Sequence, residues 1–502
     1  MLRLVVTSVL GLCALSSGSS PCQDRYSEWV SDPSVFTRDD QPKHLQGLHI
    51  ACVWRATSGE PLRVEAYKNA VDEGSPLQVT LPPTAEKSWR DFRHEIKTAL
   101  GFRRKTNDWG FLGLKQPFGI FNEYGKRLSS AKEAEDAALI FVVEGGQWYW
   151  PPLRKGFVRK LHGTNLSLET LSVQPVIFRV QGFLREHECE EIVNLGKGRM
   201  FSSPVSLMDK DKGKAAKEFR TSTQARIDRA ESEMLRNIDD RISMLTKVAV
   251  PHNEQVQILR YEKTQYYSAH LDNWDPAFYT TEGSEFIEHG HNNRLITVFW
   301  YLTNVSEGGE TTFPRSDGLP QPPDMYKCDQ GLKVKPVRGN VIFWYSLHPN
   351  GNTDPNGLHA ACPVITGEKW SANYWVWNKP RDGRGPASDV GVDEPDEDER
   401  AEFSSKLADK LAAGEQALVT FVNDHPKRSV YLFWQGDGKG EGQFMAEIKP
   451  KTRTSMKTYP GHVWVFRAGQ DIGSKKLKRF VVSDNRQQEF AIRATAAKKD
   501  EM

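Results

Sequence analysis

Two stretches decide the fold and chemistry of this chain: YYSAHLDNW at residues 266–274 and HAACPVITGEKWSANYWVW at residues 359–377. In the first, His270 and Asp272 stand two residues apart, so on a strand both side chains point to the same face. His359 opens the second stretch. Two histidines and one carboxylate form the facial triad that holds non-haem Fe(II) and leaves coordination positions open. We therefore predict that these three side chains bind a metal ion.

The segments around the predicted ligands read as short buried strands separated by turn residues. They are aromatic and β-branched: VQILRY (256–261), RLITVFWYL (294–302), VIFWYSL (341–347) and ANYWVWN (372–378). Helical patterns precede them near 188–195 and 230–248. Helices first and strands afterwards predict a mainly β domain over residues 168–380, a β-sandwich braced by helices.

Lys369 lies ten residues beyond His359 within a segment that otherwise reads as a strand. A lysine in such a place either faces solvent or binds an anion, and the nearby metal site favours the carboxylate of a 2-oxo acid. The stretches 219–227 (FRTSTQARI), 260–272, 294–314 and 332–375 closely resemble the prolyl 4-hydroxylases, a family of 2-oxoglutarate- and Fe(II)-dependent dioxygenases. The resemblance covers roughly residues 176–380 and implies a double-stranded β-helix, or jelly roll, for this catalytic domain.

The resemblance also implies a role for particular side chains. His270, Asp272 and His359 would bind Fe(II), and Lys369 would form the salt bridge to 2-oxoglutarate. The hydroxyls of Tyr261 and Thr297 would help to bind 2-oxoglutarate, and the rings of Tyr267 and Trp375 would lie beside the substrate proline, with core packing as the alternative for those rings. His289, His291 and His348 are expected to be loop residues rather than ligands.

By the same resemblance, the enzyme would hydroxylate proline in a protein or peptide to 4-hydroxyproline. It would consume O₂ and 2-oxoglutarate, release succinate and CO₂, and use L-ascorbate to restore oxidised iron. Two alternatives stay open: a hydroxylase of another side chain such as lysine, and a non-catalytic binding protein on a dioxygenase scaffold. Intact triad residues and Lys369 favour the prolyl enzyme.

Residues 403–492 are predicted to form a small all-β sandwich, joined to the catalytic domain by an acidic linker at 381–402. The stretch 419–469 resembles the β domain of the von Hippel-Lindau tumour suppressor, which binds hydroxyproline. The matching pocket residues are Trp434, Thr458, Tyr459, Gly461, His462 and Trp464. A tyrosine of that pocket would fall at Phe444 or Met445, so one hydroxyl is missing. A hydroxyproline-binding module and a sandwich used for stability or other contacts are both open.

Residues 46–152 are predicted to form a separate N-terminal unit. Extended stretches lie near 49–54, 77–81, 119–122 and 139–144, and a helix lies between the second and third. Two β-hairpins around one helix suggest a β-grasp unit, and the segments 121–130 and 138–146 faintly resemble ubiquitin-like and doublecortin-like domains. No residue there looks catalytic, so we expect an interaction or spacer module.

Net charge and cysteine content limit the classes of partner and the kinds of site that the chain can have. The 502 residues carry a formal charge of +2, which removes the long-range attraction that a nucleic acid or an acidic membrane would require. Six cysteines lack any CxxC pair, and we expect one or two disulfides and a free thiol. The cysteines are Cys13, Cys22, Cys52, Cys189, Cys328 and Cys362.

The two ends of the chain suggest a compartment. Residues 1–20 have the order of a cleaved secretory signal, with an uncleaved anchor as the alternative. The last four residues, KDEM, differ by one residue from a KDEL-type retention signal. Together they predict the endoplasmic-reticulum lumen or another part of the secretory pathway, with no membrane association after cleavage.

Overall fold

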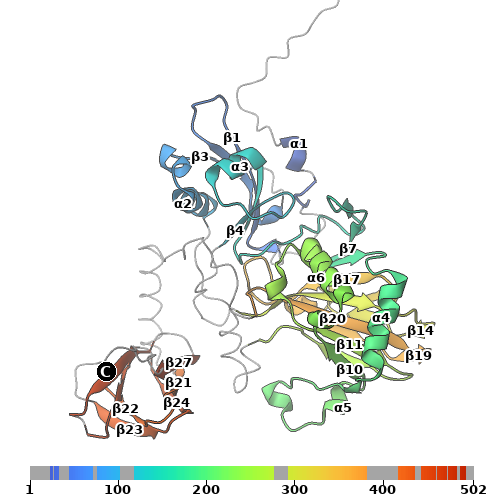
Figure 1. Ribbon diagram of the computed structural model, residues 1–502. Coiled ribbons are helices and arrows are strands. Elements are labelled where there is room, and N and C mark those ends of the chain that lie inside the picture. Colours follow the sequence, from blue (N-terminus) through green and yellow to red (C-terminus); the bar gives the residue numbers. More distant parts are fainter. Residues whose placement is uncertain are drawn as a thin grey trace, which may run out of the picture.

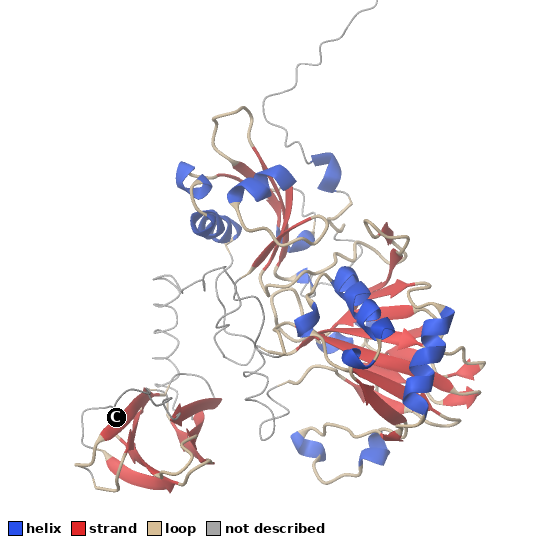
Figure 2. Ribbon diagram, in the orientation of Figure 1, coloured by secondary structure: helices blue, strands red, loops and turns tan. Residues whose placement is uncertain are grey.

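The computed structural model describes eleven segments of the chain. They are residues 23–26, 28–32, 45–71, 76–101, 118–275, 292–381, 417–435, 442–459, 461–471, 473–482 and 487–492. Strands outnumber helices and form three successive sheet-containing units, in agreement with the mainly β prediction (Figures 1 and 2). Within these segments, no helix is both long and apolar enough to cross a membrane.

Several predicted features fall outside the described residues. They are the signal peptide, the KDEM terminus, His289, His291, nearly all of the acidic linker and the start of the C-terminal unit up to residue 416.

The N-terminal unit contains a five-stranded antiparallel sheet in the order β3-β2-β1-β5-β4. Its strands are β1 (Leu48–Trp54), β2 (Arg63–Tyr67), β3 (Leu77–Thr80), β4 (Gly119–Asn122) and β5 (Leu139–Val143). Helix α2 (Trp89–Leu100) buries Phe92, Ile96 and Leu100 on one stripe. Strand β2 and a short helix, α3 (Ala131–Ala137), are additions to the predicted pair of hairpins around one helix. The β-grasp assignment itself stays a prediction.

Both faces of this N-terminal sheet are buried. On β1, Val53 belongs to the core beneath α2, whereas Ile50 and Cys52 alternate onto the opposite face. That opposite face shares one hydrophobic core with the following unit. Three consecutive aromatic residues contribute to the shared core: Trp148, Tyr149 and Trp150. The first two units are therefore packed together over an extended surface.

The second unit contains two principal sheets. The larger has the order β6-β7-β8-β17-β13-β20-β11-β10-β9, and the smaller has the order β12-β18-β15-β16. The strands of the larger sheet are β6 (Val158–Lys160), β7 (Ser167–Val173), β8 (Val176–Val180), β9 (Phe201–Ser202), β10 (Thr223–Ile227), β11 (Val256–Tyr261), β13 (Arg294–Tyr301), β17 (Val341–Tyr345) and β20 (Lys369–Trp377). Those of the smaller sheet are β12 (Tyr267–His270), β15 (Thr311–Phe313), β16 (Leu332–Val334) and β18 (His359–Ala361), and β14 (Glu307–Gly308) pairs with β19 (Val364–Thr366).

Two helices cover one face of the larger sheet, α4 (Glu186–Lys197) and α6 (Glu233–Thr246) (Figure 1). Their apolar stripes pack on residues such as Ile258, which points to that face. The other face carries Tyr261 and Phe299 and packs against Phe313 and Ala361 of the smaller sheet. Two facing sheets with helices on the outside form the helix-braced jelly roll that the sequence predicted.

The C-terminal unit consists of two small sheets, β24-β21-β27 and β23-β22-β25-β26. Their strands are β21 (Ala417–Asn423), β22 (Val430–Trp434), β23 (Gln443–Ile448), β24 (Thr452–Thr458), β25 (Val463–Arg467), β26 (Lys476–Val481) and β27 (Gln487–Ile492). Phe421 from one sheet and Leu432, Trp464 and Phe466 from the other share one core.

The cysteines agree with the prediction of disulfides and a free thiol. Cys328 and Cys362 form a disulfide, Cys52 is also disulfide-bonded, and Cys189 is a buried free thiol. Cys362 lies three residues after His359, so the disulfide joins the residue directly after β18 to the loop that precedes β16.

Candidate active site

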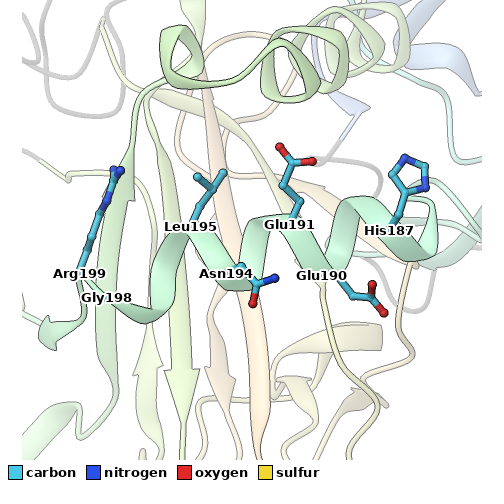
Figure 3. Close-up of a pocket in the computed structure, with 7 residues that line it drawn as sticks. All are labelled: His187, Glu190, Glu191, Asn194, Leu195, Gly198 and Arg199. Carbon is cyan, nitrogen blue, oxygen red and sulfur yellow. The ribbon is translucent and has the colours of Figure 1, made fainter.

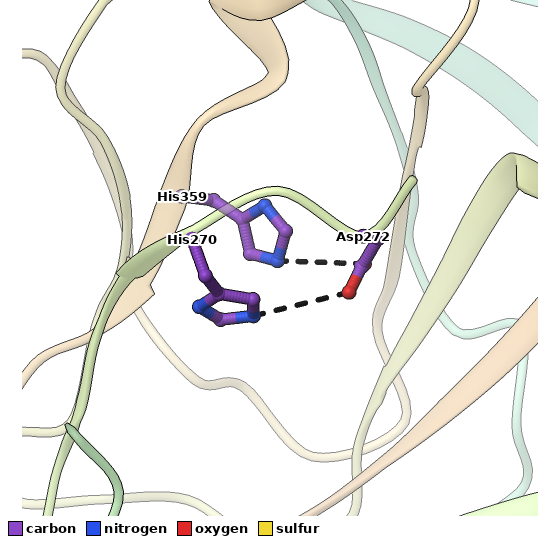
Figure 4. A group of neighbouring side chains, drawn as sticks. All are labelled: His270, Asp272 and His359. Carbon is purple, nitrogen blue, oxygen red and sulfur yellow. Dashed lines mark ion pairs between the residues drawn. The ribbon is translucent and has the colours of Figure 1, made fainter. Parts of the chain in front are cut away.

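The three predicted metal ligands converge in the second unit (Figure 4). Strands β12 and β18 pair with His270 directly opposite His359, and Asp272 follows the end of β12. Nε2 of His359 lies 3.4 Å from Oδ2 of Asp272, and Nε2 of His270 lies 3.8 Å from Oδ1. The histidine and carboxylate atoms therefore face one another without strong hydrogen bonds between them.

Each histidine is held in one orientation by its other ring nitrogen. Nδ1 of His270 bonds the carbonyl of Ser268 at 2.8 Å, and Nδ1 of His359 bonds the carbonyl of Gly357 at 2.9 Å. A carbonyl only accepts, so each Nδ1 carries the proton and each Nε2 offers a lone pair to the cluster. This is the arrangement in which histidine binds a metal ion.

The charge states also suit metal binding. Burial, reinforced by the neighbouring His359, lowers the pKa of His270 to about 3, so the ring is neutral near pH 7. Burial alone would raise the pKa of Asp272, but His359, His270 and Arg294 bring it down to about 2. One Nε2 atom from each of the two imidazoles and one carboxylate fit Fe(II).

Thr297, whose hydroxyl the resemblance implied for 2-oxoglutarate binding, contacts a predicted metal ligand in the structure. Its hydroxyl donates to Oδ2 of Asp272 at 2.6 Å and therefore orients the metal-binding carboxylate. Tyr261, by contrast, lies opposite Lys369 in the register of β11 and β20. A direct contact of either hydroxyl with 2-oxoglutarate stays a prediction.

Lys369 is fully buried, and its Nζ has no hydrogen-bond partner among the described residues. The ammonium lies 5.4 Å from the ring centroid of Tyr261, 5.3 Å from that of Phe299 and 5.8 Å from that of Tyr301. Burial lowers its pKa to about 7, with Glu310 opposing the shift. An unpaired buried ammonium is costly, so the pocket is suited to the carboxylate of 2-oxoglutarate.

A cavity of about 430 Å³ reaches the metal ligands His270 and Asp272. Tyr267 and Trp375 line it, which places both predicted substrate residues on a cavity wall rather than in the core alone. The ring of Tyr267 stacks on His270 with centroids 3.6 Å apart. Both rings thus line the same cavity as two of the ligands, and their contact with a substrate proline stays a prediction.

Three arginines line this cavity, and none of them was predicted as a site residue from the sequence: Arg220, Arg226 and Arg294. The guanidinium of Arg294 lies 3.5 Å from the ring centroid of Trp375 and forms a salt bridge with Glu254 at 2.7 Å. That of Arg220 lies 4.5 Å from the ring centroid of Tyr267. Arg294 opens the mainly apolar run 294–302, and a charge at the start of a buried strand was the available signal.

A second hollow follows the exposed face of α4 (Figure 3). Its acidic side chains bond to neighbouring elements: Glu190 pairs with Arg338 at 2.8 Å, and Glu191 accepts from Ser232 at 3.0 Å. The hollow contains none of the predicted site residues. His348 is also no part of the triad: it lies in the loop after β17, 3.8 Å from Asp354.

The C-terminal unit gathers the predicted hydroxyproline-pocket residues. Nδ1 of His462 accepts from Nε1 of Trp434 at 3.1 Å and bonds Thr458 Oγ1 at 2.9 Å. Because an indole only donates, Nδ1 is the acceptor and Nε2 of His462 carries the proton. Phe444 lies against Phe433, and Met445 is 40% exposed, so neither replaces the missing tyrosine hydroxyl.

Two family models match this chain. The 2OG-Fe(II) oxygenase superfamily matches residues 256–377, which include all three triad residues and Lys369. The VHL beta domain matches residues 410–483.

Whole proteins are also similar. Probable prolyl 4-hydroxylase 6 of Arabidopsis thaliana is 39% identical over 211 residues, which are 41% of this chain and 70% of the relative. Prolyl 4-hydroxylase 13 of the same plant is 35% identical over 220 residues, or 43% and 77% of the two chains. A solved viral collagen prolyl hydroxylase from Paramecium Bursaria Chlorella virus-1, in complex with 2OG, is 27% identical and covers 40% of this chain and 95% of its own, with a TM-score of 0.29.

Proposed function

Because this chain belongs to the prolyl 4-hydroxylase family of 2OG-Fe(II) oxygenases, we propose that it hydroxylates proline residues of a protein or peptide to 4-hydroxyproline. The observation that carries the proposal is the triad of His270, Asp272 and His359 together with the buried, unpaired ammonium of Lys369. These groups provide a metal site and an anion site in one jelly roll.

The residues fit both groups that the family requires. The triad would hold Fe(II), and Lys369 would hold the far carboxylate of 2-oxoglutarate. When bound, these groups supply oxidative decarboxylation of 2-oxoglutarate with O₂, coupled to hydroxylation of a C–H bond and release of succinate and CO₂. Thr297 keeps the Asp272 carboxylate in place, and L-ascorbate would restore iron oxidised in unproductive turnovers.

The cavity beside the triad would receive the proline. Tyr267 and Trp375 would contact a pyrrolidine ring from the cavity wall, and the guanidinium of Arg294, 3.5 Å from the ring centroid of Trp375, fixes that ring. Arg220 leaves Nη2 without a hydrogen-bond partner among the described residues, so it can donate to a peptide carbonyl. The cavity thus suits proline in an extended peptide.

Mass spectrometry of a proline-containing peptide library tests this function. The full chain would be incubated with Fe(II), 2-oxoglutarate and ascorbate, and a gain of one oxygen on proline is the expected result. A gain on lysine would identify the alternative hydroxylase. Absence of both peptide oxidation and succinate release would favour a binding protein on a dioxygenase scaffold.

A second candidate function concerns the C-terminal unit, which would bind hydroxyproline. The arrangement of Trp434, Thr458 and His462 favours it, because Nε2 of His462 is left as a donor for the hydroxyl. Through the acidic linker, such a module would hold the product near the catalytic site and support repeated hydroxylation of one proline-rich chain. The missing tyrosine hydroxyl argues against it.

We also propose that the protein works in the lumen of the endoplasmic reticulum or elsewhere in the secretory pathway. The terminal sequences support this, and so does the disulfide between Cys328 and Cys362, because disulfides persist in oxidising compartments. Protease protection of the protein in intact microsomes, lost on adding detergent, is the expected result. Digestion without detergent would contradict it.

A further inference from the structure

We propose that the N-terminal unit positions the metal ligand His359, acting through the hairpin at residues 345–354. Neither family model covers this unit, and the sequence suggested only an interaction or spacer module. The inference rests on the proposed function in one respect, that His359 is a metal ligand. Three features of the molecule carry the inference: close contacts between the N-terminal unit and the hairpin (the junction), the partly buried hairpin itself, and the capped turn that follows it.

The junction joins the segment after β5 to the end of β17. The amide of Gly145 donates to the carbonyl of Pro349 at 2.6 Å. The ring of Tyr149 stacks on Tyr345 with centroids 3.8 Å apart, and the Tyr345 hydroxyl accepts from the amide of Trp150 at 3.0 Å. All three aromatic residues are buried, so these contacts hold the base and the tip of the hairpin from one side.

At Gly145 the backbones of the N-terminal unit and the hairpin are too close to admit a side chain. A Cβ added there would lie 2.7 Å from the carbonyl oxygen of Pro349 and 3.0 Å from the amide nitrogen of Gly351, both of them backbone atoms. Gly47 is equally close, since its Cβ would lie 2.7 Å from Cβ of Asn350. A displacement of the N-terminal unit would therefore displace the hairpin.

A series of hydrogen bonds connects the hairpin to the metal ligand His359. The amide of Asp354, a fully buried residue, donates to the carbonyl of Ser346 at 2.9 Å and closes the hairpin. Its carboxylate accepts from the amide of Asn356 at 2.9 Å and caps the turn Pro355–Gly357. The carbonyl of Gly357, at the end of that turn, holds Nδ1 of His359. Tyr149 and Gly145 are thus positioning residues that act through Asp354 and Gly357.

The experiment adds a methyl group at the contact between Gly145 and the hairpin and measures metal affinity, which does not depend on turnover. Co(II) would be titrated into full-length Gly145→Ala by absorbance, and the expected affinity is about tenfold weaker, the lower end of effects seen when outer-shell support of a ligand is lost. Amide hydrogen exchange in residues 355–359 should become faster in the metal-free protein. Gly198→Ala is the matched control, since its Cβ would meet nothing within 4 Å and its φ is −85°.

A second pair of variants tests the turn. Asp354→Ala should weaken Co(II) about 10–100-fold, whereas Asp354→Asn, which keeps an acceptor for the Asn356 amide, should retain most of the affinity. If Gly145→Ala does not fold, Tyr149→Leu takes its place and removes the stacked ring instead.

The outcomes separate the two proposals. Unchanged Co(II) affinity and exchange in the junction variants, with weakened binding in Asp354→Ala, would overturn the role of the N-terminal unit. Binding of Co(II) to the wild-type chain that is insensitive to His359→Ala would instead overturn the metal assignment on which the proposed function stands.

Discussion

The catalytic pocket and the C-terminal pocket both surround histidine with aromatic rings, but they satisfy their polar atoms in opposite ways. In the catalytic pocket, Asp272 lies 3.4 Å and 3.8 Å from the two histidines, and Lys369 has no hydrogen-bond partner among the described residues. In the C-terminal pocket, Trp464 donates to Thr458 at 3.3 Å, and Thr458 in turn bonds His462 at 2.9 Å.

The catalytic pocket therefore has polar groups that are suited to bind a metal ion and an anion. The C-terminal pocket has polar groups that mostly bond to one another. Burying an unpaired ammonium costs free energy that only a bound anion offsets, so the catalytic pocket should gain stability from its ligands. The C-terminal network already pairs its donors and acceptors, so a ligand there can add little more than one hydrogen bond. Removing a polar side chain from the catalytic pocket should therefore weaken ligand binding much more than removing one from the C-terminal pocket.

The largest effect is expected for His359→Ala. Two remaining protein ligands hold Fe(II) poorly, so metal binding and succinate release should both be abolished. Metal binding can be followed by titration and succinate by chromatography. His162→Ala changes an exposed histidine between β6 and β7 and serves as the control. Near-normal turnover of His359→Ala would mean that the triad is misassigned.

Lys369→Met should raise the KM for 2-oxoglutarate about 10–150-fold, since a charge-assisted hydrogen bond contributes ~1.5–3 kcal/mol. Fe(II) affinity should be unchanged, because the lysine is not a ligand. The ligand-free variant should also have a higher Tm than the wild type, because a buried unpaired charge has been replaced by an apolar chain of similar size. The exposed Lys333→Met is the control. An unchanged KM would remove Lys369 from the anion site.

The metal site was predictable because its signal is local. His270 and Asp272 lie two residues apart, and His359 and Lys369 share one short segment that reads as a strand. The bond from Thr297 to Asp272 was not predictable, since it joins β13 of the larger sheet to a residue that follows β12 of the smaller sheet and depends on how the two sheets pack. The stacking of Arg294 on Trp375 joins two strands, and nothing in either run alone identifies the pair.

Strand and helix positions followed from periodicity, but their relation in space did not. The runs 256–261 and 341–347 contain strands β11 and β17, and the helical pattern near 230–248 contains α6, as predicted. Residues 46–152 were predicted as a separate unit, and no prediction was made of its contacts with the catalytic domain. Its sheet buries both faces, and Trp148 and Tyr149 join it to the catalytic core. Such a junction depends on surface shape, which a single sequence does not encode in any local pattern.

The pH dependence of 2-oxoglutarate binding is a further test of the difference between the catalytic and C-terminal pockets. Burial lowers the pKa of Lys369 to about 7, so above that pH the free enzyme must take up a proton to pair with a carboxylate. The apparent KM should therefore rise up to about tenfold per pH unit above 7 and stay nearly flat below it. Lys369→Met should lose this dependence. Parallel profiles for the two proteins would place the titrating group elsewhere.

The smallest effect is expected in the C-terminal pocket, where Nε2 of His462 is the donor left for a hydroxyproline hydroxyl. His462→Ala should weaken binding of a hydroxyproline peptide to the full chain about 2–12-fold, the loss of one hydrogen bond worth ~0.5–1.5 kcal/mol. Binding of the unmodified proline peptide, which lacks that hydroxyl, should not change.

Calorimetry with both peptides on wild type and variant separates this pocket from the catalytic cavity, because the variant leaves the cavity intact. His425→Ala alters another histidine of the same unit and controls for general destabilisation. Equal affinity for the two peptides, or no change in His462→Ala, would mean that the C-terminal unit does not bind hydroxyproline, and its tethering role in repeated hydroxylation would fail as well.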